Sequence, residues 1–494
     1  MRRLSVGPYS DQLVQIDPDL LYGPFANEHQ ARNNRDSPFS RGRNIMNQAP
    51  RMGDNQSAMF FWPVPDRKFV SHGEGIYLYD VTGRRYIDAS AGPQTAHIGH
   101  ANPDVIAAMH EQASKVAYAF RNHFRNEAAE GLAEDVVGLA PYDLDRVYFC
   151  SGGSEAVEAA LKLARLYAVA KGEGERFRVV SRLPSFHGMT LGSISVTGDP
   201  AASSKYAPMI VNYPKINAPF CAYRPDGESA EEAALRFANE LETTILNHGP
   251  DTILAFILEP IGGAATGALT APKAYYTRIR EICDTYGVLL IADEVMSGVG
   301  RSGKFLASEH WDMRPDIVTL AKGLGAGYTP LGATVTTAKI LNKIEANGGF
   351  VHGHTYSANP LSCAIGRAVL GVMTGNDLMA NAAKMGAVLK TGLKTLRDKY
   401  DFIGEVKGEG LLLGFDVVAD RRTGKALPAE LNAHEKITQA ALDRGLIVYT
   451  RRMFEGKRPD QFLISPPLIV TEPQCEEILG LLDEALGAFA GELK

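Results

Sequence analysis

The chain has 494 residues, and its 51 Lys and Arg residues against 57 Asp and Glu residues give a formal net charge of −6. This balance argues against a nucleic-acid-binding protein, because neutralising phosphates requires an excess of basic residues. Hydrophobic residues make up 45% of the chain and charged residues 22%, and these ordinary globular values exclude a disordered or fibrous protein.

Residues 1–56 are polar and show little periodicity, so we expect an extended N-terminal arm that lies over the body or over a partner subunit. The arm lacks the continuous apolar segment of a secretory signal, and its acidic residues are unusual for a transit peptide. No later segment reaches the roughly 18 apolar residues of a membrane span. Residues 74–90 (EGIYLYDVTGRRYIDAS) alternate apolar and polar around Thr82-Gly83, which predicts a β-hairpin in the N-terminal part of a small domain (57–103).

From about residue 104, short apolar segments alternate with helical patterns. Strands are predicted at 146–150, 177–182 (FRVVSR), 252–259, 288–293 and 316–321, and a helix near 273–286. Such a pattern predicts a parallel sheet covered on both faces, because each parallel pair needs a crossover connection. This large domain covers residues 104–360.

The last part of the chain, residues 361–494, has a different pattern. It contains helices, apolar stretches at 411–418 and 445–450, and a final amphipathic helix near 472–489. We therefore expect a smaller C-terminal α+β domain.

The five cysteines are far apart and form no CxxC pair: Cys150, Cys221, Cys283, Cys363 and Cys475. Their odd number and wide spacing favour reduced thiols over a disulfide framework or a zinc site. The sequence therefore predicts a cytoplasmic protein without a metal site and without a membrane or nucleic-acid partner.

Polar residues directly follow four of the predicted strands. They are Asp293-Glu294, Glu259-Pro260, Lys322-Gly323 and Ser151-Gly152-Gly153-Ser154. In open α/β sheets, ligands lie outside the carboxyl ends of the strands. The stretch 151–154 also begins a helix, where small residues and free N–H groups favour a phosphate.

Two nucleotide-binding motifs fail on their context. GVGRSGKF (298–305) matches the GxxxxGK of a P-loop, but Phe305 stands where Ser or Thr should bind the metal, and no strand separates the motif from the preceding LLIADE. SGGSEA is not GxGxxG, and no acidic residue follows on a second strand as a dinucleotide site requires.

A lysine, an aspartate and a phosphate cradle at neighbouring strand ends describe a pyridoxal 5'-phosphate site. The aldehyde cofactor needs an amine to hold it as a Schiff base, an anion opposite its pyridine nitrogen and donors for its phosphate. Lys322, Asp293 and Gly153-Ser154 supply these groups. Alone, each would be an ordinary solvated lysine or capping aspartate.

With these motifs, the sequence resembles the class III (subgroup II) aminotransferases that use pyridoxal phosphate, from about residue 60 to 490. The resemblance is carried by GVLLIADEVMSGVGRSGKF and DIVTLAKGLGAGYTPLGA, which contain Asp293 and Lys322, and by SGGSEAVEAALKLAR, SFHGMTLG, LEPIGG and HGHTYSANPLSCA. Within the family, the chain resembles the ω-amino acid and amine:pyruvate transaminases. The resemblance implies fold type I, with a mostly parallel seven-stranded sheet in the large domain and a small α+β domain.

The resemblance also implies roles for individual residues. Phe186 should stack on the pyridine ring and Val295 should pack on its other face, while Glu259 should orient groups around the ring hydroxyl. His187 should lie beside the ring stack, with a purely structural histidine as the alternative. Thr355 should bind the phosphate of the partner subunit's cofactor, so that a homodimer, or a tetramer of paired dimers, shares its active sites.

The phosphate turn departs slightly from the family pattern, because Gly152 stands where Ser is frequent. Ser154 and the backbone N–H groups should suffice to hold the phosphate.

Residues toward the substrate depart more from the family pattern. Gln94 stands where members often carry an aromatic residue, and it suits a substrate with a hydrogen-bonding tail, with a capping role in the adjacent turn as the alternative. Ala264 is small and leaves room for the substrate. Of Arg451, Arg452 and Arg458, we predict that Arg452 pairs with a substrate carboxylate.

The implied reaction is a ping-pong transfer of an amino group from an ω-amino acid or primary amine to a keto acid, with pyruvate as the expected acceptor and 2-oxoglutarate as the alternative. Lys322 should act as the base that moves the substrate α-proton. An aminomutase or amino-acid racemase of the same fold would use the same lysine and aspartate. A member that only binds cofactor or partners is disfavoured by the presence of Lys322, Asp293 and Phe186 together.

Overall fold

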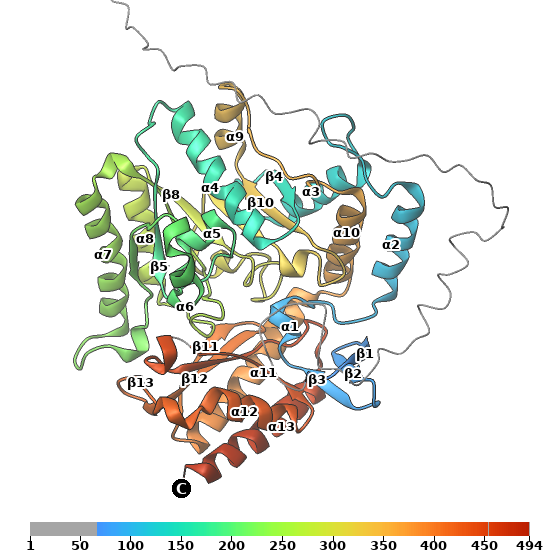
Figure 1. The fold of residues 1–494 in the computed structure, drawn as a ribbon, viewed down its shortest axis with the longest axis vertical. Helices are drawn as coiled ribbons and strands as arrows, with labels where there is room; N and C mark the ends of the chain where they lie inside the picture. The colour runs from blue at the N-terminus through green and yellow to red at the C-terminus, as the bar shows by residue number, and fades with distance from the viewer. Residues whose placement is uncertain (1–66, 453, 494) are drawn as a thin grey trace, which may run out of the picture. The chain divides into compact units, whose positions relative to one another are not determined.

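The computed structural model describes residues 67–452 and 454–493. The predicted N-terminal arm (1–56) and residues 57–66 of the predicted small domain therefore lie outside the described residues. The chain from Lys68 onward forms one compact unit, whose elements are drawn in Figure 1.

The first described elements form the predicted hairpin. Strand β1 (Val70–Glu74) pairs with β2 (Tyr77–Asp80), and β2 pairs antiparallel with β3 (Arg85–Asp88). Asp80 shapes the turn, because one of its carboxylate oxygens accepts hydrogen bonds from the hydroxyl and the N–H of Thr82. These bonds, led by the Thr82 hydroxyl, lower the pKa of Asp80 to about 2.

The central sheet has seven strands in the order β4-β10-β9-β8-β7-β5-β6. Its strands are β4 (Arg146–Cys150), β5 (Arg178–Leu183), β6 (Lys215–Asn217), β7 (Ile253–Leu258), β8 (Leu289–Asp293), β9 (Ile317–Leu320) and β10 (Gly332–Thr336). All neighbours from β9 to β6 pair in parallel, and β10 runs antiparallel to both β9 and β4. The prediction of a mostly parallel seven-stranded sheet is confirmed.

Helices cover both faces of this sheet. Successive residues of β8 belong to two separate apolar clusters: Leu290 packs in one with helices α7 and α8, and Ile291 in the other with α4 and α9. This alternation explains why the strands read as continuous apolar runs. The helices of this part are α4 (Gly153–Ala170), α5 (Leu191–Val196), α6 (Pro200–Ser203), α7 (Ala230–His248), α8 (Lys273–Tyr286) and α9 (Ala338–Glu345).

Three further helices pack beside β4. Helix α10 contacts both α2 and α3, and α3 contacts β4. Asn102 caps α2 by accepting hydrogen bonds from the N–H groups of Asp104 and Val105, and Pro103 begins the helix, where its missing N–H costs nothing. The helices are α2 (Pro103–Lys115), α3 (Glu127–Leu139) and α10 (Pro360–Gly375).

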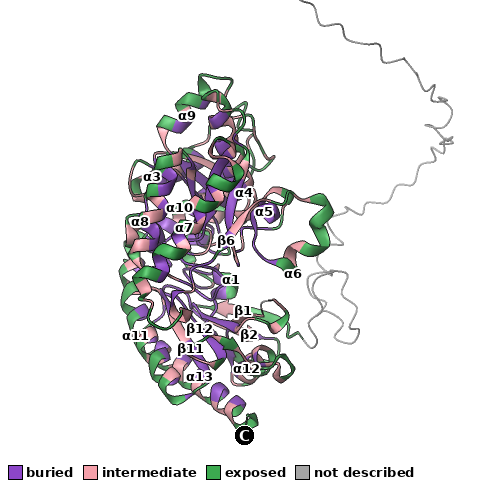
Figure 2. Cartoon of the chain, turned by 90° about the vertical axis from the view of Figure 1, so that its left-hand side faces the viewer, coloured by how far each residue is buried: buried purple, intermediate pink, exposed green. Residues whose placement is uncertain are grey.

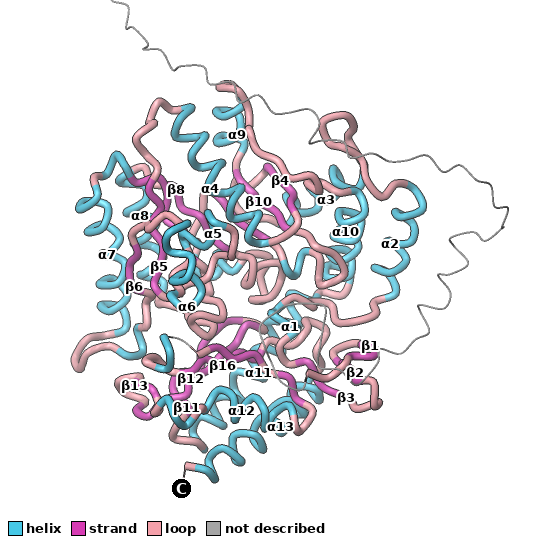
Figure 3. Tube along the Cα trace, in the orientation of Figure 1, coloured by secondary structure: helices cyan, strands magenta, loops and turns pink. Residues whose placement is uncertain are grey.

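A second sheet lies in the C-terminal part, in the order β11-β12-β16-β15, with β13 beside β12 (Figure 3). Helices α11 and α12 pack on it, α13 packs against these two helices, and Figure 2 shows exposed residues on the outer sides of the helices. The elements are β11 (Ile403–Glu409), β12 (Leu412–Asp420), β13 (Lys425–Ala426), β15 (Tyr449–Arg451), β16 (Asp460–Ile464), α11 (Leu378–Lys399), α12 (Ala433–Leu442) and α13 (Glu472–Glu492).

The apolar stretch 445–450 contributes to two sheets. Strand β14 (Leu446–Ile447) pairs in parallel with β3 and so joins the N-terminal hairpin to the C-terminal part, whereas β15 belongs to the second sheet. Short helix α1 (Ala91–Gln94) follows β3. None of the described helices is both long and apolar enough to span a bilayer.

Candidate functional site

A cavity of about 420 Å³ lies where the carboxyl ends of β4, β7, β8 and β9 meet. Eleven of the residues predicted from the sequence line it: Gln94, Gly152, Gly153, Ser154, Phe186, His187, Glu259, Ala264, Asp293, Val295 and Lys322. Because these residues come from segments far apart along the chain, only the folded chain brings them together.

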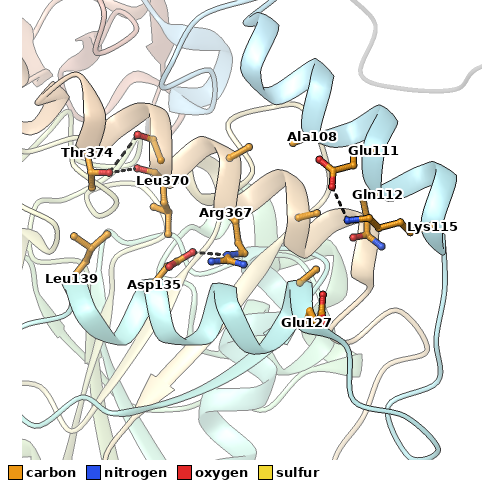
Figure 4. Close-up of a pocket in the computed structure, with 14 residues that line it drawn as sticks. Ala108, Glu111, Gln112, Lys115, Glu127, Asp135, Leu139, Arg367, Leu370 and Thr374 are labelled. Atoms are coloured by element: carbon orange, nitrogen blue, oxygen red, sulfur yellow. Dashed lines mark hydrogen bonds and ion pairs between the residues drawn. The ribbon is translucent and has the colours of Figure 1, made fainter.

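A second cavity, of about 650 Å³, lies between α2, α3 and α10 (Figure 4). Four of its charged side chains are paired: Lys115 Nζ lies 2.6 Å from Glu111 Oε1, and Arg367 Nε lies 2.8 Å from Asp135 Oδ2. None of the predicted site residues lines it. The candidate active site is therefore the smaller cavity.

Lys322 lies just past the end of β9. It begins a short 3-10 turn (Lys322–Leu324) and has a φ of +43°, a left-handed conformation that a lysine seldom adopts. Its Nζ donates a hydrogen bond of 2.7 Å to the Pro93 carbonyl. The side chain keeps partial exposure to the cavity, but protein surrounds the amine, and this desolvation lowers the pKa of Lys322 to about 8 against the opposing effect of Asp293 and Glu259.

This lowered pKa predicts unusual reactivity of Lys322. An amine with a pKa near 8 is half unprotonated at pH 8, whereas an ordinary lysine is half unprotonated only near pH 10.5. Lys322 acetylation by acetic anhydride, followed by mass spectrometry in protein freed of pyridoxal phosphate, should therefore rise through a midpoint near pH 8. The exposed Lys115, whose pKa is raised by Glu111, is the internal control. If both lysines label with one midpoint, the environment described for Lys322 is wrong.

Asp293 is the last residue of β8 and is buried. Its Oδ2 lies 2.7 Å from His187 Nδ1, and its Oδ1 accepts hydrogen bonds from Thr319 Oγ1 (3.0 Å) and from the N–H of Val295 (3.1 Å). These three contacts hold the buried carboxylate in a fixed orientation, and His187 is its direct partner.

Glu259, directly after β7, is also buried. Its Oε1 accepts a hydrogen bond from the N–H of Gly263 (2.8 Å), and Arg182 Nη2 lies 3.8 Å from its Oε2. Burial raises the pKa of Glu259, and the nearby His187 and Arg182 oppose that rise. Arg182 also donates to the Glu259 carbonyl. Sequence reasoning missed this arginine, although a lone arginine inside an apolar strand indicates a buried charge with a fixed partner.

The phosphate cradle forms at the beginning of α4. Gly152 precedes the helix and Gly153 begins it. A Cβ built on Gly153 would lie only 2.8 Å from Val295 Cγ1, so a glycine is required where the two segments meet. The hydroxyl of Ser154 accepts a hydrogen bond from the N–H of Met189 and can still donate its own proton into the cavity. An 18-residue helix with its N-terminal N–H groups at a cavity favours an anion.

The structure corrects the choice of arginine. Arg452 does not line the cavity; its guanidinium donates to Asn432 Oδ1 and to the Ala429 carbonyl. Arg451 lines it, together with Tyr449, because both belong to β15 and side chains two residues apart share one face of a strand. The Arg451 guanidinium lies 5.5 Å from the Phe186 ring centre and forms an ion pair with the buried Asp199. Arg458 instead lies over Phe220 and Phe454.

Two further predictions have different outcomes. Gln94 lines the cavity but is buried. Its side-chain amide donates a hydrogen bond to Ser465 Oγ at 3.0 Å, so this bond stabilises the fold. Thr355 is exposed and does not line the cavity of its own chain. Its carbonyl accepts a hydrogen bond from Tyr118 Oη. Its role toward a partner subunit stays a prediction.

The residues present fit pyridoxal 5'-phosphate. The cavity offers an amine of lowered pKa, a fixed carboxylate, an anion cradle and an aromatic ring, Phe186. Two buried polar atoms at the cavity, His187 Nε2 and Glu259 Oε2, have no hydrogen-bond partner among the described residues. Buried polar atoms are rarely left without a partner, so these two indicate a polar ligand.

Comparison with known proteins agrees with this arrangement. A family model described as aminotransferase class-III matches residues 63–486. The chain is 40% identical over 427 residues to an uncharacterized aminotransferase, YodT, of Bacillus subtilis, covering 86% of this chain and 96% of that protein. It is 32% identical to a probable γ-aminobutyrate transaminase 3 of Oryza sativa subsp. indica, covering 85% and 82%.

Solved structures are similar over the same range. An amine transaminase from an uncultivated Pseudomonas species, in a form with bound pyridoxal phosphate, has a TM-score of 0.81 and 36% identity, covering 88% of this chain and 98% of that one. The ω-transaminase of Pseudomonas jessenii has a TM-score of 0.81 and 31% identity, covering 86% and 93%.

Proposed function

The chain belongs to the class-III aminotransferases, which use pyridoxal phosphate, and we propose that it moves an amino group from an ω-amino acid or a primary amine to a keto acid, with pyruvate as the acceptor. One observation carries this choice of donor: the cavity has an arginine, Arg451, at the side of Phe186, and its lining also includes the small Ala264. A guanidinium binds a carboxylate with two parallel hydrogen bonds. The γ-aminobutyrate transaminases among the relatives act on such a donor by name.

Arg451 can serve donors with and without a carboxylate. Its partner Asp199 is buried and stays in place through its own hydrogen bond to the N–H of Ala201. In the absence of a substrate carboxylate, the ion pair with Asp199 compensates the charge of Arg451. An acid or keto acid in the cavity would compete with Asp199 for the guanidinium.

Bound pyridoxal phosphate supplies an electron sink for the carbon that loses its proton. Gly152, Gly153 and Ser154 would hold its phosphate, Phe186 and Val295 its ring, and Asp293 its ring nitrogen. Lys322 Nζ, whose pKa of about 8 leaves a fraction of the amine unprotonated near neutral pH, would take the substrate α-proton and return it to the adjacent carbon. Phe186, Met296 and Val295 would exclude water from that transfer.

The first test is a spectrum of the purified full-length protein. Adding γ-aminobutyrate, β-alanine or a primary amine without keto acid should remove the visible absorption of the cofactor, and pyruvate should restore it with formation of alanine. A donor that is isomerised while no keto acid is consumed would overturn the proposal in favour of an isomerase. A colourless protein that does not respond to added cofactor would overturn it in favour of a binding protein.

Arg451→Ala should separate the two classes of donor. We expect KM for carboxylate donors and for pyruvate to rise about 10- to 100-fold, because a charged hydrogen-bond pair contributes roughly 1.5–3 kcal/mol. The KM for a primary amine should change little. Arg452→Ala, one residue along and outside the cavity, is the matched control. If Arg452→Ala raises KM for the acids and Arg451→Ala does not, the assignment is reversed.

The proposal includes a homodimer, or a tetramer of paired dimers, with Thr355 completing the partner's phosphate site, and a cytoplasmic location. An apolar surface supports it: Tyr118, Phe120, Phe124, Val351 and Tyr356 are all substantially exposed on segments that contact each other through Tyr118. Sedimentation of the chain at micromolar concentration should give a dimer or larger, and a monomer with full activity would contradict it. Cell fractionation tests the location.

We also propose a domain division with an arm at 1–56, a small domain formed by 57–103 and 361–494, and a large domain at 104–360. The parallel pairing of β14 with β3 supports it, because it brings both small-domain segments into one sheet. Deletion of residues 1–50 should weaken the dimer if the arm lies over the interface. An unchanged dimer would remove that role from the arm.

A further inference from the structure

Arg301 is a completely buried arginine in the segment GVGRSGKF, eight residues after Asp293. Its Nη1 lies within hydrogen-bond distance of three carbonyl oxygens, those of Leu411 (3.3 Å), Ser465 (3.3 Å) and Pro466. Among the described residues, no carboxylate lies within ion-pair distance of it. A buried arginine is normally paired with an acid, and one held by carbonyls alone keeps an uncompensated positive charge.

His97 connects this charge to the candidate site. Arg301 Nη2 lies 3.3 Å from His97 Nδ1. The His97 ring in turn packs against Gly323, the residue after Lys322: a Cβ built on Gly323 would lie 2.3 Å from His97 Nε2. The side chain of His97 therefore connects Arg301 to the turn that contains Lys322.

The segment that supplies the Ser465 and Pro466 carbonyls to Arg301 also binds the segment that the Lys322 amine contacts. The N–H of Ser465 donates to the Ala89 carbonyl, and the N–H of Leu468 donates to the His97 carbonyl. These bonds fix the segment 89–97, which contains the Pro93 carbonyl that accepts the Lys322 Nζ hydrogen bond. Arg301 thus holds both the turn that carries Lys322 and the segment that its amine contacts.

We propose that Arg301 is a positioning residue for Lys322: through His97 and the 465–466 carbonyls it fixes the lysine in the cavity. The proposal rests on the proposed function only for the role of Lys322 in the reaction. A guanidinium suits this position better than an ammonium group, because its two Nη atoms reach different acceptors, the carbonyls at Nη1 and His97 at Nη2.

The charges around Lys322 set the expected direction. Asp293 and Glu259 stabilise its protonated form, and Arg301 opposes it. His187 and Arg451 line the same cavity, and Arg451 is paired with Asp199. His97 is kept neutral by its burial and by Arg301, which lower its pKa. The acid that acts on Arg301 from a distance is Asp88. Removing the charge of Arg301 should therefore raise the pKa of Lys322.

Two variants separate charge from packing. Arg301→Gln removes the charge and keeps a polar side chain, whereas Arg301→Lys keeps the charge and loses the fork. Arg176 is the control: it is also buried and donates to the carbonyls of Pro250, Ile253 and Tyr286, but it forms an ion pair with Glu173, and none of these partners lines the cavity. Arg176→Gln and Arg176→Lys should lower Tm without changing Lys322.

The experiment measures acetylation of Lys322 by acetic anhydride against pH, by mass spectrometry of the full-length protein freed of pyridoxal phosphate, beside the Tm of each variant. We expect Arg301→Gln to move the midpoint upward by roughly half a unit to one unit, and Arg301→Lys to leave it near the wild-type value. An unchanged midpoint in folded Arg301→Gln, or an equal shift in Arg176→Gln, would overturn the proposal.

If Arg301→Gln does not fold, a comparison of Arg301→Lys with Arg176→Lys tests the proposal. Arg301→Lys should reduce kcat for amino transfer at least tenfold more than Arg176→Lys at a similar loss of Tm, because it misplaces the Lys322 amine. Equal losses of kcat in the two lysine variants would overturn the positioning role. The acetylation readout needs no amino transfer, so a failure of the proposed function leaves it interpretable.

Discussion

Lys322→Ala is expected to reduce amino transfer by roughly 10³-fold or more while the protein stays folded and still binds pyridoxal phosphate. The change removes the amine that moves the substrate proton. Arg451 offers no acceptor atom in its place, and His187 Nδ1 is held by Asp293. The phosphate cradle and the ring contacts do not involve Lys322. The measurement is single-turnover conversion of γ-aminobutyrate by stoichiometric enzyme, together with cofactor binding by absorption.

Another half-buried lysine gives the control for Lys322→Ala. Lys215 donates to the carbonyls of Ser195 and Tyr213, its pKa is lowered by burial, and it does not line the cavity. Lys215→Ala should lower Tm but leave single-turnover conversion within about threefold of wild type. Wild-type turnover in Lys322→Ala would show that the reaction does not use this lysine.

Asp293→Asn is expected to lower kcat by roughly 10²- to 10⁴-fold with a much smaller effect on binding of the cofactor. The amide keeps the shape of the carboxylate and can still accept bonds from Thr319 and Val295, but it has no charge. Without that anion, nothing in the described site holds a proton on the ring nitrogen of the cofactor. The ring then accepts electrons poorly, and proton removal at the substrate carbon becomes slow.

The neighbouring acid serves as the control for Asp293→Asn. Glu294 is equally buried, but it does not line the cavity and accepts hydrogen bonds from Ser297, Ala307 and Ser308. Burial raises the pKa of Glu294 to about 7. Glu294→Gln should therefore affect Tm more than kcat. A larger loss of kcat from Glu294→Gln than from Asp293→Asn would contradict the role given to Asp293.

The strand-end residues of the site can be predicted from local patterns in the sequence. Lys322, Asp293, Glu259 and the stretch 151–154 each follow an apolar run, and the carboxyl ends of parallel strands meet at one edge of a sheet. Local spacing therefore implies their proximity, and the cavity at that edge confirms it. The family resemblance added Phe186, His187 and Val295, which line the same cavity.

The choice between Arg451 and Arg452 shows where sequence reasoning fails. The two residues are adjacent, and a shift of one position moves a side chain to the other face of a strand. The pairing of β15 with β16 decides which face of the strand each β15 side chain occupies, and in this pairing Arg451 lies opposite Gln461. The loop between these strands is long, so the sequence did not reveal where the pairing begins.

By itself, the sequence determined the class of protein, the cofactor chemistry and the residues that follow the parallel strands, because each of these depends on patterns that are local in the chain. The tertiary structure alone decided which arginine lines the cavity, that Gln94 bonds to Ser465, and that Arg301 and His97 support the Lys322 turn. Those contacts join segments separated by up to 371 positions. No local pattern encodes them, because they arise only when the N-terminal and C-terminal segments pack against the same edge of the sheet.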